Sequence, residues 1–256
     1  MKDLVPLPRI IIAGGRGFLG QLLAQSFLND GYDVVLLSRN ISQTGVLGRL
    51  VKWDGESAGD WIEELEESRA LINLTGRSID CRHSPSNRQE ILDSRIKSTR
   101  VLGEALNHCI KPPTVWLNAS SMALYGQCVG DEEAHDESSP ITKSGFLEEV
   151  TVAWEDELFK FNNPNVRKVA MRISFILGRS SGAFPLLKKL ASFGLGGKQG
   201  SGRQWMSWLH EDDWVGIVRF LLEKEVITGP VNLASPIPVK NKDFMRVLRN
   251  HFAPLG

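Results

Sequence analysis

The apolar pattern changes its period twice near the start of the chain. Residues 10–13 read Ile, Ile, Ile and Ala, apolar residues from position 18 onward recur with helical spacing, and residues 34–37 form a second apolar run. Short continuous apolar runs are typical of buried parallel strands, whereas a spacing of roughly three or four residues is typical of a helix with one buried face. The pattern therefore predicts a βαβ unit.

The same alternation continues along the rest of the chain. Apolar runs predict further strands at residues 50–53, 70–74, 114–119, 166–175 and 231–234. Helical spacing predicts helices at residues 60–69, 87–109, 147–161, 183–193, 214–223 and 241–251. This order predicts an α/β fold, a Rossmann-like doubly wound parallel sheet with a small C-terminal lobe on the substrate side. We place the sheet in residues 1–177 and the lobe in residues 178–256, and expect residues 208–235 to return to the sheet.

Glycines cluster where the first predicted strand meets its helix. The segment RIIIAGGRGFLG, residues 9–20, has glycine at positions 14, 15, 17 and 20. Glycines there allow a tight turn and a close approach to an anion, which the first-turn amides of the helix then face. The motif predicts a dinucleotide pyrophosphate site with contacts from Gly14, Gly15, Arg16, Gly17, Phe18 and Leu19. Such turns also occur as plain strand-to-helix corners, so that interpretation stays open.

The end of the second strand indicates which dinucleotide would bind. NAD-binding proteins place an acidic residue there, on the ribose 2′-hydroxyl, whereas this chain has Ser38 and Arg39. A guanidinium suits a 2′-phosphate because its planar fork makes paired, charge-assisted hydrogen bonds. We therefore predict NADP (NADPH) as the cofactor of the domain formed by residues 1–177. The alternative for Arg39 is a solvated surface charge.

Two later strands also end in residues that suit a cofactor site. A third strand in a doubly wound sheet ends near the adenine, so Trp53 and Asp54 are candidates for that pocket; a buried Trp and a turn Asp are equally good interpretations. The fourth strand delivers Leu74, Thr75 and Gly76 at its carboxyl end, where ligands of open α/β sheets bind. The next loop carries basic residues that form either an anion-binding rim or a solubilising surface: Arg77, Arg82, His83 and Arg88.

Composition argues against several classes of protein. Thirty basic and thirty acidic residues cancel and the pI is near 7.0, so nothing favours nucleic acid or an anionic membrane as a partner. Three cysteines without CxxC spacing, no apolar run long enough to cross a bilayer and no secretory h-region predict a cytoplasmic protein. Neither an HExxH motif nor a Cys/His cluster with metal-ligand spacing occurs, so we expect no metal.

Several motifs together resemble one protein superfamily. GGRGFLG, NLTG and SSMALYG, after the first, fourth and fifth strands, are similar to motifs of the extended short-chain dehydrogenases/reductases, which include nucleotide-sugar epimerases and dehydratases. MRISFILGRSSGAFPLL and GLGGKQGSGRQWMSWLHEDD look like its atypical NAD(P)-dependent epimerase/dehydratase-like branch, sometimes labelled nucleoside-diphosphate-sugar epimerase or cell-division-inhibitor-like. The resemblance spans nearly the whole chain and implies NADP binding. It adds the cofactor-binding candidates Arg95, Ala119, Ser120, Arg172 and Ile173.

The catalytic motif of that superfamily is missing. A tyrosine followed four residues later by a lysine normally moves the proton while hydride moves to or from nicotinamide. Neither of the chain's two tyrosines, Tyr32 and Tyr125, is followed by lysine at that spacing. The resemblance places the two positions on Leu147 and Thr151, which cannot transfer a proton at a useful pH. The remaining catalytic candidates are Ser120, at the position of a substrate-orienting serine, and Tyr125, as a substitute proton donor.

The C-terminal half supplies candidates for a substrate site. His135 lies in the acidic stretch 131–137, which we interpret as a solvated loop at the mouth of the site. The glycine-rich loop 194–204 is typical of a substrate lid, and it carries candidate ligands for an anionic or sugar-like molecule: Lys198, Arg203 and Gln204. Family members generally continue beyond the position of Gly256, so we expect either a truncated chain or a reduced lobe.

Two functions remain open at this point. The first is an NADP(H)-dependent oxidoreductase or epimerase-like enzyme with an unorthodox proton donor and a small sugar-like or carbonyl substrate. The second is a catalytically inactive NADP(H)-binding sensor or regulatory protein, which loss of both dyad residues favours. The resemblance also implies that a homodimer could form through the helices around residues 91–106 and 147–161. Cofactor binding is therefore a firmer prediction than turnover.

Overall fold

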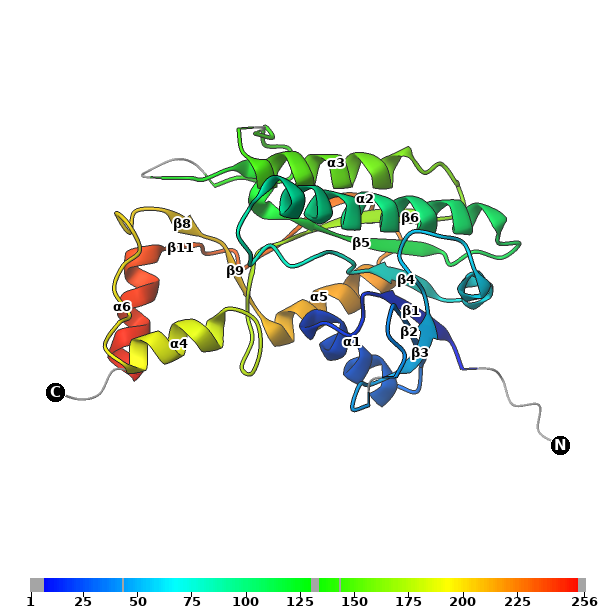
Figure 1. The fold of residues 1–256 in the computed structure, drawn as a ribbon, viewed down its shortest axis with the longest axis horizontal. Helices are drawn as coiled ribbons and strands as arrows, with labels where there is room; N and C mark the ends of the chain where they lie inside the picture. The colour runs from blue at the N-terminus through cyan, green and yellow to red at the C-terminus, as the bar shows by residue number, and fades with distance from the viewer. Residues whose placement is uncertain (1–6, 43, 130–133, 143, 253–256) are drawn as a thin grey trace.

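A computed structural model describes residues 7–42, 44–129, 134–142 and 144–252. Within these residues a sheet of seven strands runs in the order β10-β6-β5-β4-β1-β2-β3 (Figure 1). All neighbouring strands of this sheet are parallel. The strands are β1 (Arg9–Ala13), β2 (Asp33–Ser38), β3 (Arg49–Lys52), β4 (Ala70–Asn73), β5 (Val115–Ser121), β6 (Arg167–Ile173) and β10 (Gly229–Leu233). The sheet confirms the predicted Rossmann-like α/β fold.

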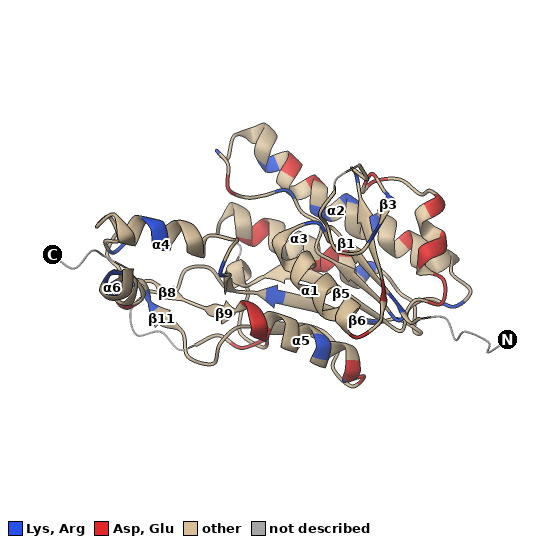
Figure 2. Ribbon diagram, turned by 90° about the horizontal axis from the view of Figure 1, so that it is seen from below, with Lys and Arg blue, Asp and Glu red and all other residues tan. Residues whose placement is uncertain are grey.

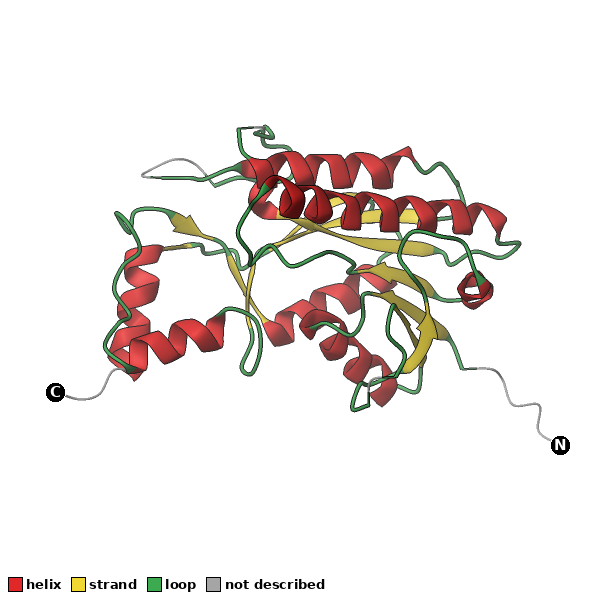
Figure 3. Cartoon of the chain, in the orientation of Figure 1, coloured by secondary structure: helices red, strands yellow, loops and turns green. Residues whose placement is uncertain are grey.

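Helices cover both faces of this sheet, as Figures 1 and 3 show. α1 (Phe18–Asn29) and α5 (Glu211–Glu223) cover one face, and α2 (Pro85–His108) and α3 (Phe146–Lys160) cover the other. Successive side chains of a strand point to opposite faces. Ile10 and Ile12 of β1 therefore join the core beneath α1 and α5, while Ile11 joins the core beneath α2 and α3. The continuous apolar strand predicted from the sequence is thus buried on both sides.

The strand order reverses beside β1. Ala13, the last residue of β1, pairs with Leu37 of β2 on one side and with Asn73 of β4 on the other. The chain fills one half of the sheet with β2 and β3, then crosses to β4 and continues outward through β5, β6 and β10. Ligands of open α/β sheets bind beyond the carboxyl ends of the strands at such a switch point. The fold therefore directs attention to that edge of the sheet.

The last part of the chain contributes to two regions. α5 and β10 belong to the layers just described, because β10 pairs with β6 along residues 229–233. α4 (Phe184–Ser192) and α6 (Asn241–Phe252) pack on each other around Ala191, Met245 and Leu248 at the end of the molecule away from β3 (Figure 1). Two short antiparallel strands, β8 (Trp205–Met206) and β11 (Val239–Lys240), join this pair of helices to the rest.

Some elements differ from the hydrophobic prediction. The helix expected at residues 60–69 is a shorter 3₁₀ helix, η1 (Asp60–Leu65). The strand expected at residues 166–175 divides after Ile173, because β7 (Phe175–Leu177) leaves the central sheet and pairs with β9 (Trp208–His210). The pattern did not predict β8, β9 or β11, since strands of two or three residues are too short to show a period.

Charge is spread over the elements rather than gathered on one of them. Figure 2 shows basic and acidic residues interspersed along the helices and loops, which agrees with the equal totals in the sequence. Among the described helices, none is both long and apolar enough to cross a bilayer.

Candidate functional site

A cavity of about 670 Å³ opens at the carboxyl ends of β1 to β4. Nine of the predicted cofactor-binding residues line it: Gly14, Arg16, Gly17, Ser38, Arg39, Trp53, Leu74, Thr75 and Gly76. They come from the ends of different strands, and the parallel arrangement brings those ends to one edge of the sheet. We call this space the nucleotide cavity.

The glycines beside β1 have different structural roles. Gly14 adopts a φ of +73°, and a Cβ on it would lie 2.9 Å from the backbone of Leu74. A Cβ on Gly20 would lie 2.5 Å from the Cα of Gly15. Both positions therefore need glycine for packing alone. Gly17 lines the cavity with φ −71°, and a Cβ on it would meet only the Gly14 carbonyl at 3.6 Å. Nothing within the fold requires glycine at position 17, so its glycine fits close approach of a ligand.

The first turn of α1 is open to an anion. Gly17 is the N-cap residue, no described side chain caps the helix, and the first turn contains no acidic residue. The first backbone amides of a helix lack intrahelical acceptors and carry the positive end of the helix dipole. By contrast, Ser84 caps α2 by accepting a hydrogen bond from the Asn87 amide. The α1 terminus thus keeps donors available beside the nucleotide cavity.

A guanidinium from the glycine turn reaches the end of β2. Arg16 Nη1 donates to Ser38 Oγ at 3.2 Å and to the Asn40 carbonyl at 3.1 Å. Arg39 lines the same cavity from an exposed position, and its carbonyl accepts a hydrogen bond from Lys52 Nζ at 2.5 Å. Two guanidinium groups therefore belong to the wall of the cavity near the end of β2, although the sequence argument rested on Arg39 alone.

Several buried polar atoms beside this cavity have no hydrogen-bond partner in the described part of the chain: Arg16 Nε, Trp53 Nε1 and Thr75 Oγ1. Buried polar groups are normally hydrogen-bonded, and an unpaired one costs about 1–3 kcal/mol. All three residues line the nucleotide cavity. The phosphates and ribose of a dinucleotide would supply partners for these unpaired atoms and for the uncapped helix, and would occupy the space beside Gly17. The residues present therefore fit such a cofactor.

The far wall of the nucleotide cavity comes from α2 and the loop after β3. Besides the candidates Asp54 and Arg77, it adds residues that were not predicted: Gly55, Glu56, Glu90, Asp93, Ser94 and Lys97. Lys97 Nζ pairs with Glu56 Oε2 at 3.3 Å, which joins that loop to α2. Arg77, one of the four basic loop residues, pairs with Glu90. The partners of these two ion pairs lie 41 and 13 residues apart in the sequence, so no local motif predicts them.

Arg95 lies beneath the Thr75–Gly76 turn rather than in the cavity wall. Its Nη1 donates to the carbonyls of Ile91, at 2.9 Å, and Arg77, at 3.2 Å, and its guanidinium lies 5.0 Å from the Trp154 ring centroid. Burial lowers the pKa of Arg95 to about 10. Close by, buried Asn73 accepts a hydrogen bond from the Thr75 amide at 3.0 Å. These contacts support the turn that ends β4.

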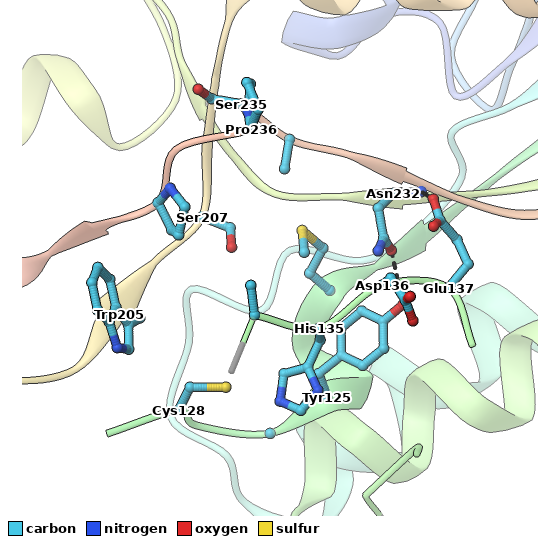
Figure 4. A pocket seen from close by; sticks show the side chains of 15 residues that line it. Tyr125, Cys128, His135, Asp136, Glu137, Trp205, Ser207, Asn232, Ser235 and Pro236 are labelled. Carbon is cyan, nitrogen blue, oxygen red and sulfur yellow. Dashed lines mark hydrogen bonds between the residues drawn. The ribbon is translucent and has the colours of Figure 1, made fainter. Parts of the chain in front are cut away.

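A second cavity, of about 430 Å³, lies beyond the carboxyl ends of β5 and β10, on the side where the sequence predicts the substrate. Its residues follow β5, occupy or follow β10, or belong to residues 134–137 and 205–207. Figure 4 shows Trp205 and Ser207 on one side and Asn232 and Glu137 on the other. We call this space the substrate-side cavity. It contains Tyr125 and His135 from the sequence predictions, whereas Lys198, Arg203 and Gln204 are not among its described lining residues.

A buried network surrounds the Tyr125 hydroxyl. Tyr125 accepts a hydrogen bond from Arg172 Nη1 at 2.7 Å and donates to Asn232 Oδ1 at 2.9 Å. Arg172 is 3% exposed and holds both oxygens of Glu155, at 3.0 and 2.9 Å. Ser120 Oγ donates to the same carboxylate at 2.5 Å. Burial acts to lower the pKa of Arg172, but its hydrogen bonds to Glu155 and Tyr125 raise the pKa above its usual value.

This network brings together three predicted residues, Ser120, Tyr125 and Arg172, through Glu155. Glu155 lies 35 residues from Ser120 and 17 from Arg172. Only Tyr125 of the three lines the substrate-side cavity. Its ring stacks on the His135 imidazole, with centroids 5.1 Å apart and planes within 3°. His135, predicted from the sequence to lie in a solvated loop, therefore packs against the tyrosine ring.

The two α3 positions assigned to the missing dyad serve the helix itself. Thr151 is buried, and its hydroxyl donates to the Leu147 carbonyl at 2.7 Å. A threonine that bonds four residues back along a helix satisfies its own hydroxyl locally. Neither side chain lines the substrate-side cavity.

The remaining predicted cofactor residues lie behind the two cavities. A Cβ on Gly15 would meet the Leu36 side chain, which makes its role one of packing. Phe18 packs against Gly178, and Leu19 accepts a hydrogen bond from Trp214 Nε1 at 3.2 Å. The others are strand residues that pair across β5 and β6: Ala119, Ser120, Arg172 and Ile173. In the described part of the chain, no group of three or more Asp, Glu, His or Cys residues is arranged to hold a metal.

Rossmann-type dinucleotide binding is the class of function that this fold and the nucleotide cavity define. Residues 10–234 match the model of the NAD dependent epimerase/dehydratase family, and the chain belongs to that family. This confirms the predicted atypical epimerase-like branch, and the chain is an NAD(P)-binding, epimerase-like protein.

Relatives support the same assignment. Epimerase family protein YfhF of Bacillus subtilis is 34% identical over 252 residues, covering 96% of this chain and 82% of its own. The crystal structure of human epimerase family protein SDR39U1 with NADPH is 29% identical, covers 94% of this chain and 80% of its own, and has a TM-score of 0.81. MoeE5 in complex with UDP-glucose and NAD, at 19% identity, covers 97% of this chain and 85% of its own, with a TM-score of 0.78, and shows the fold alone.

Proposed function

We propose that this protein is an NADP(H)-dependent oxidoreductase or epimerase-like enzyme acting on a small carbonyl or sugar-like substrate. The observation that carries the proposal is the pair of cavities along the carboxyl edge of one parallel sheet. A dinucleotide with its adenosine in the nucleotide cavity would extend along that edge toward β5 and β6. Its reactive end would then lie toward the substrate-side cavity, which Tyr125 lines.

The 2′-phosphate is assigned to the end of β2. Arg16 and Arg39 both line the cavity there, and Ser38 holds the Arg16 guanidinium at 3.2 Å. Arg16 Nε still has a free donor in the described structure. No acidic side chain occupies the end of this strand, where an NAD-binding protein holds the 2′-hydroxyl. The human relative solved with NADPH is consistent with this preference.

Other predicted residues hold the rest of the cofactor. The Gly14–Gly17 turn and the first amides of α1 bind the pyrophosphate. Trp53 covers the adenine, and Thr75 supplies its unpartnered hydroxyl to a ribose or phosphate oxygen. Ser120 acts through Glu155 as a positioning residue, because its hydroxyl is committed to that carboxylate at 2.5 Å.

When bound at this site, NADPH would supply the hydride that the carbonyl carbon of the substrate accepts, leaving NADP⁺. Tyr125 supplies the proton to the carbonyl oxygen, giving an alcohol, and then regains a proton from solvent. The Arg172 guanidinium, 2.7 Å from the tyrosine oxygen, steadies the negative charge left on that oxygen. This arrangement substitutes for a dyad whose positions hold Leu147 and Thr151. Asn232 accepts the hydroxyl hydrogen at 2.9 Å until a substrate takes its place.

A second function is an NADP(H)-binding sensor without turnover. The observation that favours it is the complete hydrogen bonding of Tyr125, whose oxygen already has a donor and an acceptor inside the protein. In that case the cofactor would be held in the nucleotide cavity while the second cavity served a regulatory ligand.

Titration with NADPH, followed by nicotinamide fluorescence, tests both functions. We expect saturable NADPH binding and then oxidation of NADPH by members of a panel of aldehydes, ketones and nucleotide sugars. Tight binding with no oxidation by any member of the panel would favour the sensor. Absence of binding would contradict both functions.

A further inference from the structure

The described lining of the substrate-side cavity carries negative but no positive side-chain charge. Among the described residues that line it, none is Lys or Arg, and two, Asp136 and Glu137, are acidic. Asp136 accepts hydrogen bonds from the Ser138 and Ser139 hydroxyls, which lower the pKa of its carboxyl and keep it ionised near neutral pH. Glu137 Oε1 accepts a hydrogen bond from the Asn232 amide at 2.7 Å. An anion entering this cavity would therefore meet repulsion.

Two cations contact lining side chains without lining the cavity themselves. Arg172 lies behind Tyr125 and holds both oxygens of Glu155, a carboxylate that partly offsets its charge. Lys240 Nζ lies 4.9 Å from the Trp205 ring centroid and is outside the cavity lining. Proteins that bind diphosphates use guanidinium groups, ammonium groups or helix N-termini aimed at the phosphates. The described lining of this cavity offers none of these to a second diphosphate.

The rest of the lining is suited to a flat apolar ring. Met122, Trp205, Pro236 and Pro238 contribute apolar surface. Figure 4 shows the Trp205 ring facing the same space as Tyr125. Aromatic side chains bind ring-bearing ligands by stacking and by burial of apolar area. Tyr125 and Asn232, which share a hydrogen bond, lie at the other end of the cavity, and Ser207 lies on the same side as Trp205.

We propose that the substrate-side cavity takes a ring-bearing aldehyde or ketone without negative charge, with its ring toward Trp205 and its oxygen toward Tyr125, and excludes nucleoside diphosphate sugars. This substrate class rests on the proposed function, because it assumes that the carbonyl is the group reduced. This substrate class distinguishes the chain from MoeE5, a protein of the same fold that was solved with UDP-glucose.

Three ketones that share one ring test the proposal by charge alone. They are acetophenone, 4-acetylbenzoate and 4-(aminomethyl)acetophenone, with UDP-glucose as a fourth ligand. Binding to the protein saturated with NADP⁺ is measured by ligand-observed NMR. We expect acetophenone to bind at least about tenfold more tightly than 4-acetylbenzoate, given the repulsion from two carboxylates, and UDP-glucose not to displace it. Equal or tighter binding of 4-acetylbenzoate, displacement by UDP-glucose, or no binding of acetophenone would overturn the proposal. The ammonium compound should bind at least as tightly as acetophenone, because the same carboxylates attract a cation, and binding weaker than that of 4-acetylbenzoate would also overturn the proposal.

Two variants locate the effect in this cavity. Glu137→Gln removes one charge while its amide oxygen can still accept the hydrogen bond from the Asn232 backbone amide, so the ratio of 4-acetylbenzoate affinity to acetophenone affinity should rise several-fold. Ser207→Arg adds the missing cation to the lining and should improve binding of 4-acetylbenzoate about tenfold. Ser192→Arg, on exposed α4 outside the cavity, is the matched control and should change neither ligand. Gains of the same size in the control would contradict the assignment to this cavity.

The cofactor titration is done first on each protein, so the two proposals fail in different ways. Normal NADPH binding with the wrong order of ketones overturns the substrate class and leaves the cofactor proposal standing. Loss of NADPH binding in the wild-type protein overturns the proposed function. In that case the affinities of the three ketones are measured without cofactor. Tighter binding of 4-acetylbenzoate than of acetophenone would still contradict the proposal that this cavity repels anions.

Discussion

The two cavities lie along the same edge of one sheet, yet they offer different chemistry. The described lining of the nucleotide cavity has four basic and four acidic side chains, but the charged groups at the end of β2 are the guanidinium groups of Arg16 and Arg39. The cavity also has an uncapped helix and buried donors without partners in the described part of the chain. The substrate-side cavity has two carboxylates, and its buried polar atoms around Tyr125 are already hydrogen-bonded to one another. The buried donors of the nucleotide cavity still need hydrogen-bond acceptors, which an anionic ligand would supply. The buried polar atoms around Tyr125 need none. This difference indicates that negative charge enters the protein with the cofactor and not with the substrate.

The largest expected effect comes from filling the open glycine of the nucleotide cavity. Gly17→Val should reduce affinity for both NADPH and NADH by more than about 100-fold, because the side chain occupies the place of a pyrophosphate. Its stability should change little, since a Cβ there meets only one atom, at 3.6 Å. Isothermal calorimetry and thermal unfolding measure the two effects. Gly216→Val, in open space on α5, is the control. Unimpaired binding in Gly17→Val would place the cofactor elsewhere.

The second prediction concerns the only tyrosine of the substrate-side cavity. Tyr125→Phe should lower the rate of NADPH oxidation by about 10²–10⁴-fold with any accepted carbonyl compound, because the proton donor is lost. NADPH affinity should stay within about twofold, since Tyr125 does not line the nucleotide cavity. Tyr32→Phe, which changes the other tyrosine of the chain, should have no effect on rate. A full rate in Tyr125→Phe would move the proton donor to another group.

The third prediction tests whether the buried ion pair of Arg172 and Glu155, behind Tyr125, stabilises the fold. Glu155→Gln should destabilise the fold by about 3–5 kcal/mol, because it leaves the buried Arg172 guanidinium without its carboxylate. Urea unfolding measures the change. The exposed pair of Lys111 and Glu67 supplies the control, since Glu67→Gln should leave the unfolding midpoint unchanged. Equal midpoints for the two variants would show that the Arg172 network is not a stabilising feature.

The smallest expected effect separates the two arginines at the end of β2. Arg39→Ala and Arg16→Met should each weaken NADPH binding by about 10- to 100-fold, as expected for loss of a charge-assisted hydrogen bond. NADH, which lacks the 2′-phosphate, should lose less than about threefold by the same argument. Competition titrations with the two cofactors measure the difference. Equal losses for NADPH and NADH would remove the 2′-phosphate assignment.

The nucleotide cavity could be predicted from the sequence because its signals are local. Each signal directly follows one apolar run: the glycine turn follows residues 10–13, Ser38 and Arg39 follow residues 34–37, and Thr75 and Gly76 follow residues 70–74. Arg16 was in the predicted set, but its contact with Ser38, 22 residues away, required the parallel pairing of β1 and β2. Local motifs place residues at the edge of a sheet, and strand order decides which of them meet.

The substrate-side cavity could be predicted only in part. Tyr125 and Ser120 were candidates from the resemblance, but the partners that determine their chemistry lie far along the chain. Tyr125 meets Arg172 and Asn232 across 47 and 107 residues. The cavity also depends on β8, which is too short to show a period. Its acidic lining was visible as composition, yet only the fold shows that Asp136 and Glu137 face the same space as Trp205.

The most direct test of the charge difference between the cavities is the ratio of the dissociation constants of NADH and NADPH for the wild-type protein. The two cofactors differ only in the 2′-phosphate, and two guanidinium groups line the cavity where we place it. Measured side by side at one ionic strength, NADPH should bind at least about 100-fold more tightly than NADH. A ratio near one, or a preference for NADH, would contradict the account of the nucleotide cavity as a site built for the additional phosphate.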